Sequence, residues 1–238
     1  MKNFSTVYLL FLIPAVFALA GCDNLTGLNG NGNVKSEERS VGSFDQISAG
    51  GAFEIFLTQG DSESLRVEAD ENLLSLIETT VRSGRLVIRS RENIGRSKKL
   101  NVYITFRELT KIEASGACDI SGTGQLNFNN LVLNGSGASE IDLSLRAGKL
   151  RGDYSGASEV EFEGSAEMCE FKLSGACELE APNLIVGQMT IKLSGASKAE
   201  VQVIEQLEVN ASGASSVVYT GDPVVEQHTS GASKVRKK

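Results

Sequence analysis

A four-residue phrase, Ser-Gly-Ala followed by Ser or Cys, returns seven times in the second half of the chain. The first serines of successive copies lie 18 to 21 residues apart. A period near twenty residues indicates a stacked repeat, because each unit then buries its apolar face against the next. The copies begin at Ser115, Ser136, Ser155, Ser174, Ser194, Ser212 and Ser230.

The residues around each copy alternate between apolar and polar side chains. The second residue after each copy is apolar, and so is the residue five positions before each of the last six copies. A period of two is typical of a strand with one buried face, so we expect one strand on each side of the Ser-Gly-Ala corner. The two columns are Ile120, Ile141, Val160, Leu179, Ala199, Val217 and Val235, and Leu131, Leu150, Cys169, Met189, Leu207 and Val225.

Two or three short strands per repeat, without an amphipathic helix, predict an all-β solenoid: a parallel β-helix with about seven regular coils. Glycine allows the sharp turn at each corner, and coils about 4.8 Å apart give a rod of roughly 35 Å. A sandwich of hairpins would instead need turn signals every 8–12 residues or so and would lack the strict long period.

The first 21 residues are typical of a signal peptide. Lys2 precedes an apolar run, Val7 to Leu19, that is too short to span a bilayer as a helix. The run ends in Leu-Ala-Gly-Cys22, which resembles the lipobox of bacterial lipoproteins. In that class a peptidase cuts before a cysteine that carries diacylglycerol. We therefore predict that residues 1–21 are removed and that Cys22 is the lipid attachment site. The alternative is an ordinary signal peptide with an incidental cysteine.

The anchor places the protein in the bacterial envelope, because two or three acyl chains hold a protein stably on a membrane. Asp23 follows the cysteine, and in enteric bacteria this resembles a signal for retention at the inner membrane. Other phyla do not read it in that way, so both membranes stay open. We expect the outer membrane, with the domain in the periplasm or on the cell surface.

The mature chain divides by composition. Residues 22–41 are rich in Asn and Gly and then charged, which predicts a flexible tether. Residues 42–238 predict one β-solenoid domain. Within it, 42–110 form irregular N-terminal coils that cap the stack, 111–233 form the repeats, and 234–238 form a basic tail that discourages edge-to-edge aggregation.

The N-terminal coils carry several alternating runs. We expect four strands there and one short helix over residues 72–78, capped by Asp70. The expected strands are residues 53–57, 65–69, 85–89 and 100–106.

The same region resembles a known family. The resemblance depends on four stretches: Gly42-Ser43-Phe44-Asp45 with Ile47, residues 53–61, Asp70-Glu71-Asn72-Leu73 and Leu86-Val87-Ile88. Together with the Ser-Gly-Ala-Ser coils they resemble the putative autotransporter adhesin, head GIN domain family, over about Gly42 to Val225. The resemblance implies a right-handed parallel β-helix in secreted or lipid-anchored envelope proteins. Its motifs are structural and name no catalytic residue.

Acidic side chains recur at the polar positions after each corner. Stacking would place them on one sheet face, about 5 Å apart between coils. We favour a solvated acidic face, and weak binding of divalent cations is the second interpretation. The chain lacks the Gly-Gly-x-Gly-x-Asp repeat of calcium-binding β-helices. The acidic columns are Asp119, Glu140, Asp142, Glu159, Glu161, Glu178, Glu180 and Glu200.

The cysteines of the repeats predict packing rather than chemistry. Cys118 and Cys177 replace the last Ser of the phrase three coils apart, too far for a disulfide. Cys169 lies in an apolar column, and a Cys169–Cys177 bridge would have to join different columns across a corner. Without a Cys-x-x-Cys pair, we expect no metal site.

Catalytic groups are scarce. The chain has one histidine, His228, no Trp and 4 Tyr. An acid–base pair needs two different environments, whereas stacked carboxylates share nearly identical ones. We expect no enzyme and no cofactor.

Nucleic acid is excluded as a partner. The net charge is −7, and an export signal is present. The basic residues between Arg82 and Lys99 lack interleaved aromatic side chains.

These observations favour a lipid-anchored, non-enzymatic envelope protein that binds or scaffolds an envelope or extracellular polymer or protein, with adhesion as the expected role. A self-assembling structural lipoprotein is the alternative, and a polysaccharide-acting β-helix enzyme ranks last. The sequence leaves the ligand and the oligomeric state open.

Overall fold

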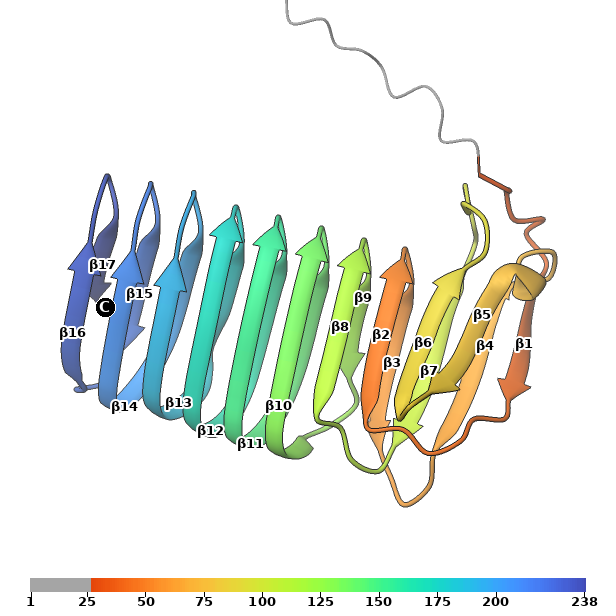
Figure 1. Ribbon diagram of the computed structural model, residues 1–238, viewed down its shortest axis with the longest axis horizontal. Helices are drawn as coiled ribbons and strands as arrows, with labels where there is room; N and C mark the ends of the chain where they lie inside the picture. Colours follow the sequence, from red (N-terminus) through yellow and green to blue (C-terminus); the bar gives the residue numbers. More distant parts are fainter. Residues whose placement is uncertain (1–26) are drawn as a thin grey trace, which may run out of the picture.

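The computed structural model describes residues 27–238, which form the predicted parallel β-solenoid (Figure 1). The repeats wind from β8 to β17, and each coil pairs in parallel with the next. Among the described residues, no helix is long and apolar enough to cross a bilayer. The strands of the repeats are β8 (Lys111–Gly116), β9 (Asp119–Gly122), β10 (Leu126–Gly137), β11 (Glu140–Gly156), β12 (Glu159–Gly175), β13 (Glu178–Leu193), β14 (Lys198–Ala211), β15 (Ser216–Thr220), β16 (Val224–Thr229) and β17 (Lys234–Lys237).

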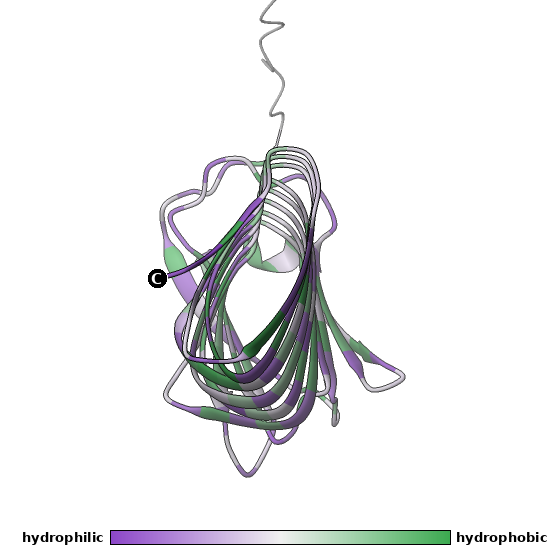
Figure 2. Cartoon of the chain, turned by 90° about the vertical axis from the view of Figure 1, so that its left-hand side faces the viewer, coloured by the Kyte–Doolittle hydropathy of each residue, from purple (hydrophilic) through white to green (hydrophobic). Residues whose placement is uncertain are grey.

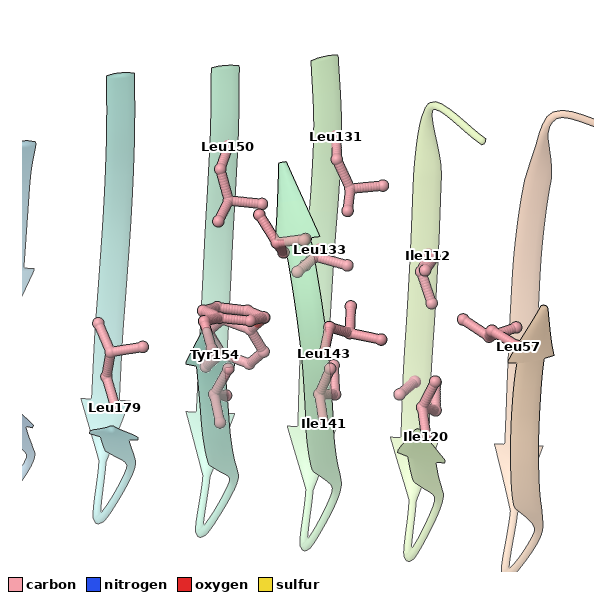
Figure 3. Packing of buried hydrophobic residues seen from close by; sticks show 14 of the residues in the cluster. Leu57, Ile112, Ile120, Leu131, Leu133, Ile141, Leu143, Leu150, Tyr154 and Leu179 are labelled. Atoms are coloured by element: carbon pink, nitrogen blue, oxygen red, sulfur yellow. The ribbon is translucent and has the colours of Figure 1, made fainter. Parts of the chain in front are cut away.

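The predicted apolar columns are confirmed as files inside the coil. Ile141 is paired in register with Ile120 on one side and with Val160 on the other, and Leu179 follows. All four side chains are buried, and Figure 3 labels three of them, Ile120, Ile141 and Leu179, within the hydrophobic cluster. In the view along the rod, successive coils superpose around this interior (Figure 2). Burial of like residues in files is therefore what holds neighbouring coils together.

Glycine at each corner meets two separate demands. Gly156 has a φ of +86°, a conformation that L side chains rarely adopt. A Cβ atom built on Gly156 would also lie 2.4 Å from the carbonyl oxygen of Gly137 in the previous coil. The same oxygen accepts a 2.8 Å hydrogen bond from the N–H of Ala157. The contact repeats at all seven Ser-Gly-Ala corners, so the coils approach too closely there for any other residue.

One further copy of the corner precedes the seven found in the sequence. Gly50-Gly51-Ala52-Phe53 stacks beneath the first copy, where the N–H of Ala117 donates to the oxygen of Gly51 at 2.8 Å. This copy does not match the Ser-Gly-Ala phrase, because its first and last residues are Gly and Phe.

The coils before the repeats stack out of chain order. The coil of β2 and β3 lies between that of β6 and β7 and that of β8 and β9, and it pairs with both in parallel. β4 and β5 add antiparallel strands outside β7 and β6, and β1 lies outside β4. The bounds are β1 (Val34–Arg39), β2 (Gln46–Gly51), β3 (Glu54–Gln59), β4 (Ser64–Asp70), a 3₁₀ turn η1 (Leu74–Leu76), β5 (Ile77–Arg82), β6 (Arg85–Ser90) and β7 (Leu100–Phe106).

Two expectations for this region are wrong. The predicted helix over residues 72–78 is only the turn η1, because Ile77 already begins β5. The predicted tether is an ordered part of the domain from residue 27 onwards; residues 22–26 lie outside the described part of the chain. β1 pairs along its whole length with β4, and the Asn and Gly residues before it are held by hydrogen bonds.

Asp70 joins three segments at this end of the rod. Its buried carboxylate accepts hydrogen bonds from the N–H groups of Gly32 and, at 2.7 Å, Lys98, instead of capping a helix. The hydrogen bond from the Lys98 N–H is the main reason that the pKa of Asp70 lies below its usual value, with the Gly32 bond adding to it against the opposing effect of burial. Asp70 therefore fastens the entering chain to the loop before β7.

Both ends of the rod carry polar side chains at positions that point inward. At the N-terminal end, Arg39 lies opposite the core residue Leu65 and is only 15% exposed. Its guanidinium donates to the carbonyl oxygens of Ile77 at 2.6 Å and Leu74 at 2.9 Å. Inward charge of this kind discourages another strand from adding to the edge.

At the C-terminal end, Gln227 continues the file of Val209 and Lys237 continues that of Tyr219, where it pairs with Asp222. The predicted basic tail is thus in part the last strand, β17, which pairs with β15. Polar residues thus take two of the inward positions in this coil, whereas Val225 and Val235 continue the apolar files, as expected for a capping repeat.

We expect Gly156→Ala to lower the free energy of unfolding by about 3 kcal/mol or more, because it combines backbone strain with a clash against the neighbouring coil. Gly124→Ala is the matched control: Gly124 also has positive φ, +70°, but nothing lies within 4 Å of its added Cβ. The control should lose only about 1–2 kcal/mol. Urea denaturation measures both, and equal losses would show that stacking does not require glycine.

We expect Asp70→Asn to lower stability at pH 7 and to flatten its acid dependence. A depressed carboxyl pKa contributes stability above the unfolded value, about 3.9, that is lost as pH falls through the folded value. Melting temperatures between pH 7 and pH 2 test this, with the exposed turn residue Asp61→Asn as control. Parallel curves for the wild type and Asp70→Asn would contradict the assignment.

Candidate functional site

A groove of about 1280 Å³ runs along the rod at the corner opposite the Ser-Gly-Ala corners. It begins at the end of β3 and the connection between β7 and β8 and continues over β10 to β14. Its lining residues are Gln59, Arg107–Thr110, Asn127–Asn130, Arg146–Gly148, Ser165–Met168, Ile185, Gly187, Gln188, Ile204 and Glu205.

Small residues make the corner concave. Ala147 and Ala166 are paired in register on adjacent coils and are buried. Gly148 and Gly187 follow the same bend, and a Cβ on either would lie 2.8 Å from a backbone oxygen of the preceding coil. Side chains at the bend are therefore small or missing in the coils of β11 and β13, whereas Glu167 takes the equivalent position in β12. The side chains on either side of the bend form the walls of the groove.

Apolar side chains gather at one half of the groove. Met168, Ile185 and Ile204 are 43%, 45% and 54% exposed, whereas most large apolar residues of the described chain are buried. Exposed apolar surface on a monomeric domain often marks a binding site. Glu167 and Glu205 lie beside them on the rim.

Amide and guanidinium groups dominate the other half. Gln59 donates to the oxygens of Arg107 and Asn127 at 3.2 and 3.0 Å and accepts from the Asn127 N–H at 2.8 Å. This network fixes the groove end, where Arg107 and Arg146 supply positive charge. A groove with apolar patches and oriented polar groups suits an extended ligand lying along the rod.

The predicted acidic columns are stacked. Asp142, Glu161 and Glu180 occupy equivalent positions on successive coils. Partial burial, and then the neighbouring carboxylates, raise the pKa of Glu161 above its usual value. Among residues 27–238, no group of three or more His, Cys, Asp or Glu side chains is placed to hold one metal ion. Weak cation binding therefore stays a prediction.

The central acidic column continues into an aromatic pair that the sequence reading missed. Phe56 and Tyr103 follow Ser121 across adjacent strands, with ring centroids 4.9 Å apart, and the guanidinium of Arg66 lies 3.8 Å from the Tyr103 ring centre. The sequence contained one indication of this pair: Phe56 and Tyr103 are aromatic residues at outward-facing positions of strands that otherwise alternate between apolar and polar residues. The two stacked rings come from strands far apart in the sequence.

The cysteines of the repeats and His228, which the sequence analysis also considered, lie outside the groove. Cys118, Cys169 and Cys177 are buried and free, and burial raises the pKa of the Cys169 thiol to about 12, so it stays protonated. His228 is exposed beside Glu226, 3.3 Å away. Cys22 lies outside the described residues.

The geometry defines a β-solenoid with capped ends and a long lateral groove. The family model described as "Putative auto-transporter adhesin, head GIN domain" matches residues 43–223. The chain belongs to this family, which confirms the resemblance noted in the sequence and supports an adhesin-like, non-enzymatic role at the cell surface or envelope.

Three solved structures share the fold. A "putative adhesin" from Bacteroides fragilis superposes with a TM-score of 0.83 at 22% identity, covering 89% of this chain and 100% of the other. A "putative adhesin" from Parabacteroides distasonis gives 0.74 at 22% identity, with coverage of 89% and 100%. A "putative lipid binding protein" from the same species gives 0.71 at 20% identity, with coverage of 89% and 99%. No curated protein sequence matches the chain.

We expect Glu161→Gln to raise the melting temperature at pH 7. The raised pKa means that ionised Glu161 is disfavoured in the fold, so removing its charge stabilises the protein, and the gain fades below the unfolded pKa of about 4.3. Glu92→Gln, at an exposed position, is the control. A loss of stability at pH 7 would show that Glu161 has an attractive partner.

Proposed function

We propose that this protein is an adhesin-like binding protein anchored in the bacterial envelope by lipid on Cys22, most suitably in the outer membrane. It binds a polymer or an extended segment of protein through the lateral groove and is not an enzyme. The family and the fold support an adhesin-like role, and the lipobox sequence supports the anchor.

The observation that carries the proposal is the contrast between the ends and the side of the rod. Arg39 at one end and Gln227 and Lys237 at the other interrupt the apolar interior. Adding a second copy end to end would bury these polar groups without new partners, which costs free energy. The groove, in contrast, exposes apolar side chains over several coils.

The groove suits a slender occupant. It extends along the stacked coils and presents one set of side chains per coil, about 4.8 Å apart. A linear glycan or an extended peptide repeats its contacts along such a line. Nearly identical carboxylates on the acidic face do not supply the two different pKa values that acid–base hydrolysis needs.

Glycan arrays and immobilised envelope polymers test the binding role. Met168→Glu combined with Ile185→Glu should lower binding about tenfold or more, because charge replaces apolar contact in the groove. Val224→Glu is the control, since Val224 is 76% exposed but lies on the last coil outside the groove. Equal binding by all three proteins would place the ligand site elsewhere.

Anchoring is tested separately in cells. Cys22→Ala should abolish incorporation of radiolabelled palmitate and move the protein from the membrane to the soluble fraction. Protease treatment of intact cells then reports whether the domain faces outward. Palmitate labelling that persists in Cys22→Ala would contradict the assignment of the lipid site.

A further inference from the structure

One connection on the Ser-Gly-Ala side of the rod departs from the tight corner. In the coil of β6 and β7, residues 91–99 form a long loop in place of the short turn, and in Figure 1 it rises beside the entering chain. The Leu28 N–H donates to the Asn93 oxygen at 2.9 Å, and the Gly95 N–H donates to the Leu28 oxygen at 3.0 Å. The loop is thus fixed to the point where the described chain begins.

A second set of contacts strengthens this junction. The Gly30 N–H donates to the Arg96 oxygen at 2.7 Å, and the Arg96 N–H donates to the side-chain oxygen of Asn29 at 2.8 Å. Backbone and side-chain bonds therefore hold the loop and the entering segment as one unit.

The loop is rich in exposed positive charge. It carries four cations and one acid, Glu92, on a protein whose net charge is −7. Arg91 and Lys99 have partners at 2.6 and 3.2 Å but keep 63% and 45% of their side chains exposed. Arg96 and Lys98 are exposed and form no ion pair with any residue of the described chain. Leu28, 45% exposed, adds an apolar side chain beside them.

The patch lies close to the proposed anchor. Only five positions separate Cys22 from Gly27, so the chain between them spans at most roughly 18 Å. The loop is therefore held near any surface in which the Cys22 lipid is inserted. Cations close to an anionic bilayer are attracted by about 1 kcal/mol each, within a Debye length of about 8 Å.

We propose that residues 91–99 together with Leu28 form a docking surface for the anionic phospholipid headgroups of the bilayer that holds the anchor. The inference rests on the proposed lipid anchor. Docking at the Ser-Gly-Ala side fixes the N-terminal end of the rod at the membrane and turns the groove, on the opposite corner, away from it. The acidic columns near the middle of the rod are repelled by the same surface, which favours this orientation.

The test uses the full lipidated protein in vesicles of phosphatidylcholine alone or with added phosphatidylglycerol. A fluorophore on Ser97→Cys reports proximity through quenching by nitroxide-headgroup lipids, because the described cysteines are buried. Quenching should be strong with phosphatidylglycerol, weak without it, and reversed by high salt. Arg96→Glu with Lys98→Glu should shift the docking equilibrium by roughly 30-fold or more toward the free state.

The matched control is Lys234→Glu with Arg236→Glu, which makes the same charge change on the last coil and should leave quenching unchanged. Unaltered melting curves establish that both variants are folded. The docking surface alone is overturned if the protein floats with both kinds of vesicle but its quenching is equal in the two. The same holds if the protein floats and the loop variant leaves the quenching unchanged. Failure to float with either vesicle overturns the anchor and the docking surface with it.

Discussion

The close approach of backbone at each Ser-Gly-Ala corner is the constraint on which this structure depends. The Ala N–H donates to the Gly oxygen of the previous coil at 2.7–2.8 Å, and the glycine Cα faces that oxygen at a distance that excludes a side chain. Because only glycine fits against the carbonyl oxygen of the previous coil, the glycine sets the position of each corner. The strands on both sides of the corner then pair in parallel register. The apolar files follow from that register.

The same regularity creates a problem at the ends, because a stack of identical coils would continue with any other copy. The two ends of the rod prevent such continuation with different polar residues. Arg39 satisfies backbone oxygens from an inward position at the N-terminal end. At the C-terminal end, polar Gln227 and Lys237 take two inward positions beside the apolar Val225 and Val235. The out-of-order coil of β2 and β3 pairs on both sides, so the N-terminal cap is part of the same continuous sheet as the repeats. A rod with closed ends leaves its long sides for recognition.

In our proposals, the two long sides of the rod have different functions: one contacts the membrane and the other binds the ligand. The Ser-Gly-Ala side carries the entering chain and the basic loop 91–99, while the opposite corner carries the groove with Met168, Ile185 and Ile204. One rigid scaffold can therefore face the membrane at one corner and a ligand at the other. The acidic columns lie between them and keep the exposed face soluble.

The sequence by itself determined the solenoid, its period, the position of the buried files and the packing role of the cysteines, because each rests on local spacing that every coil repeats. It also carries a stretch ending in Cys22 that resembles a lipobox, and the family resemblance. It failed where contacts are long-range. The Asn- and Gly-rich entering segment looks flexible because its partners, Asp70 and the loop before β7, lie tens of residues away. The stacking of Phe56 on Tyr103, the crossing of the N-terminal coils and the groove were decided only by the tertiary structure, since each requires knowing which coil lies beside which.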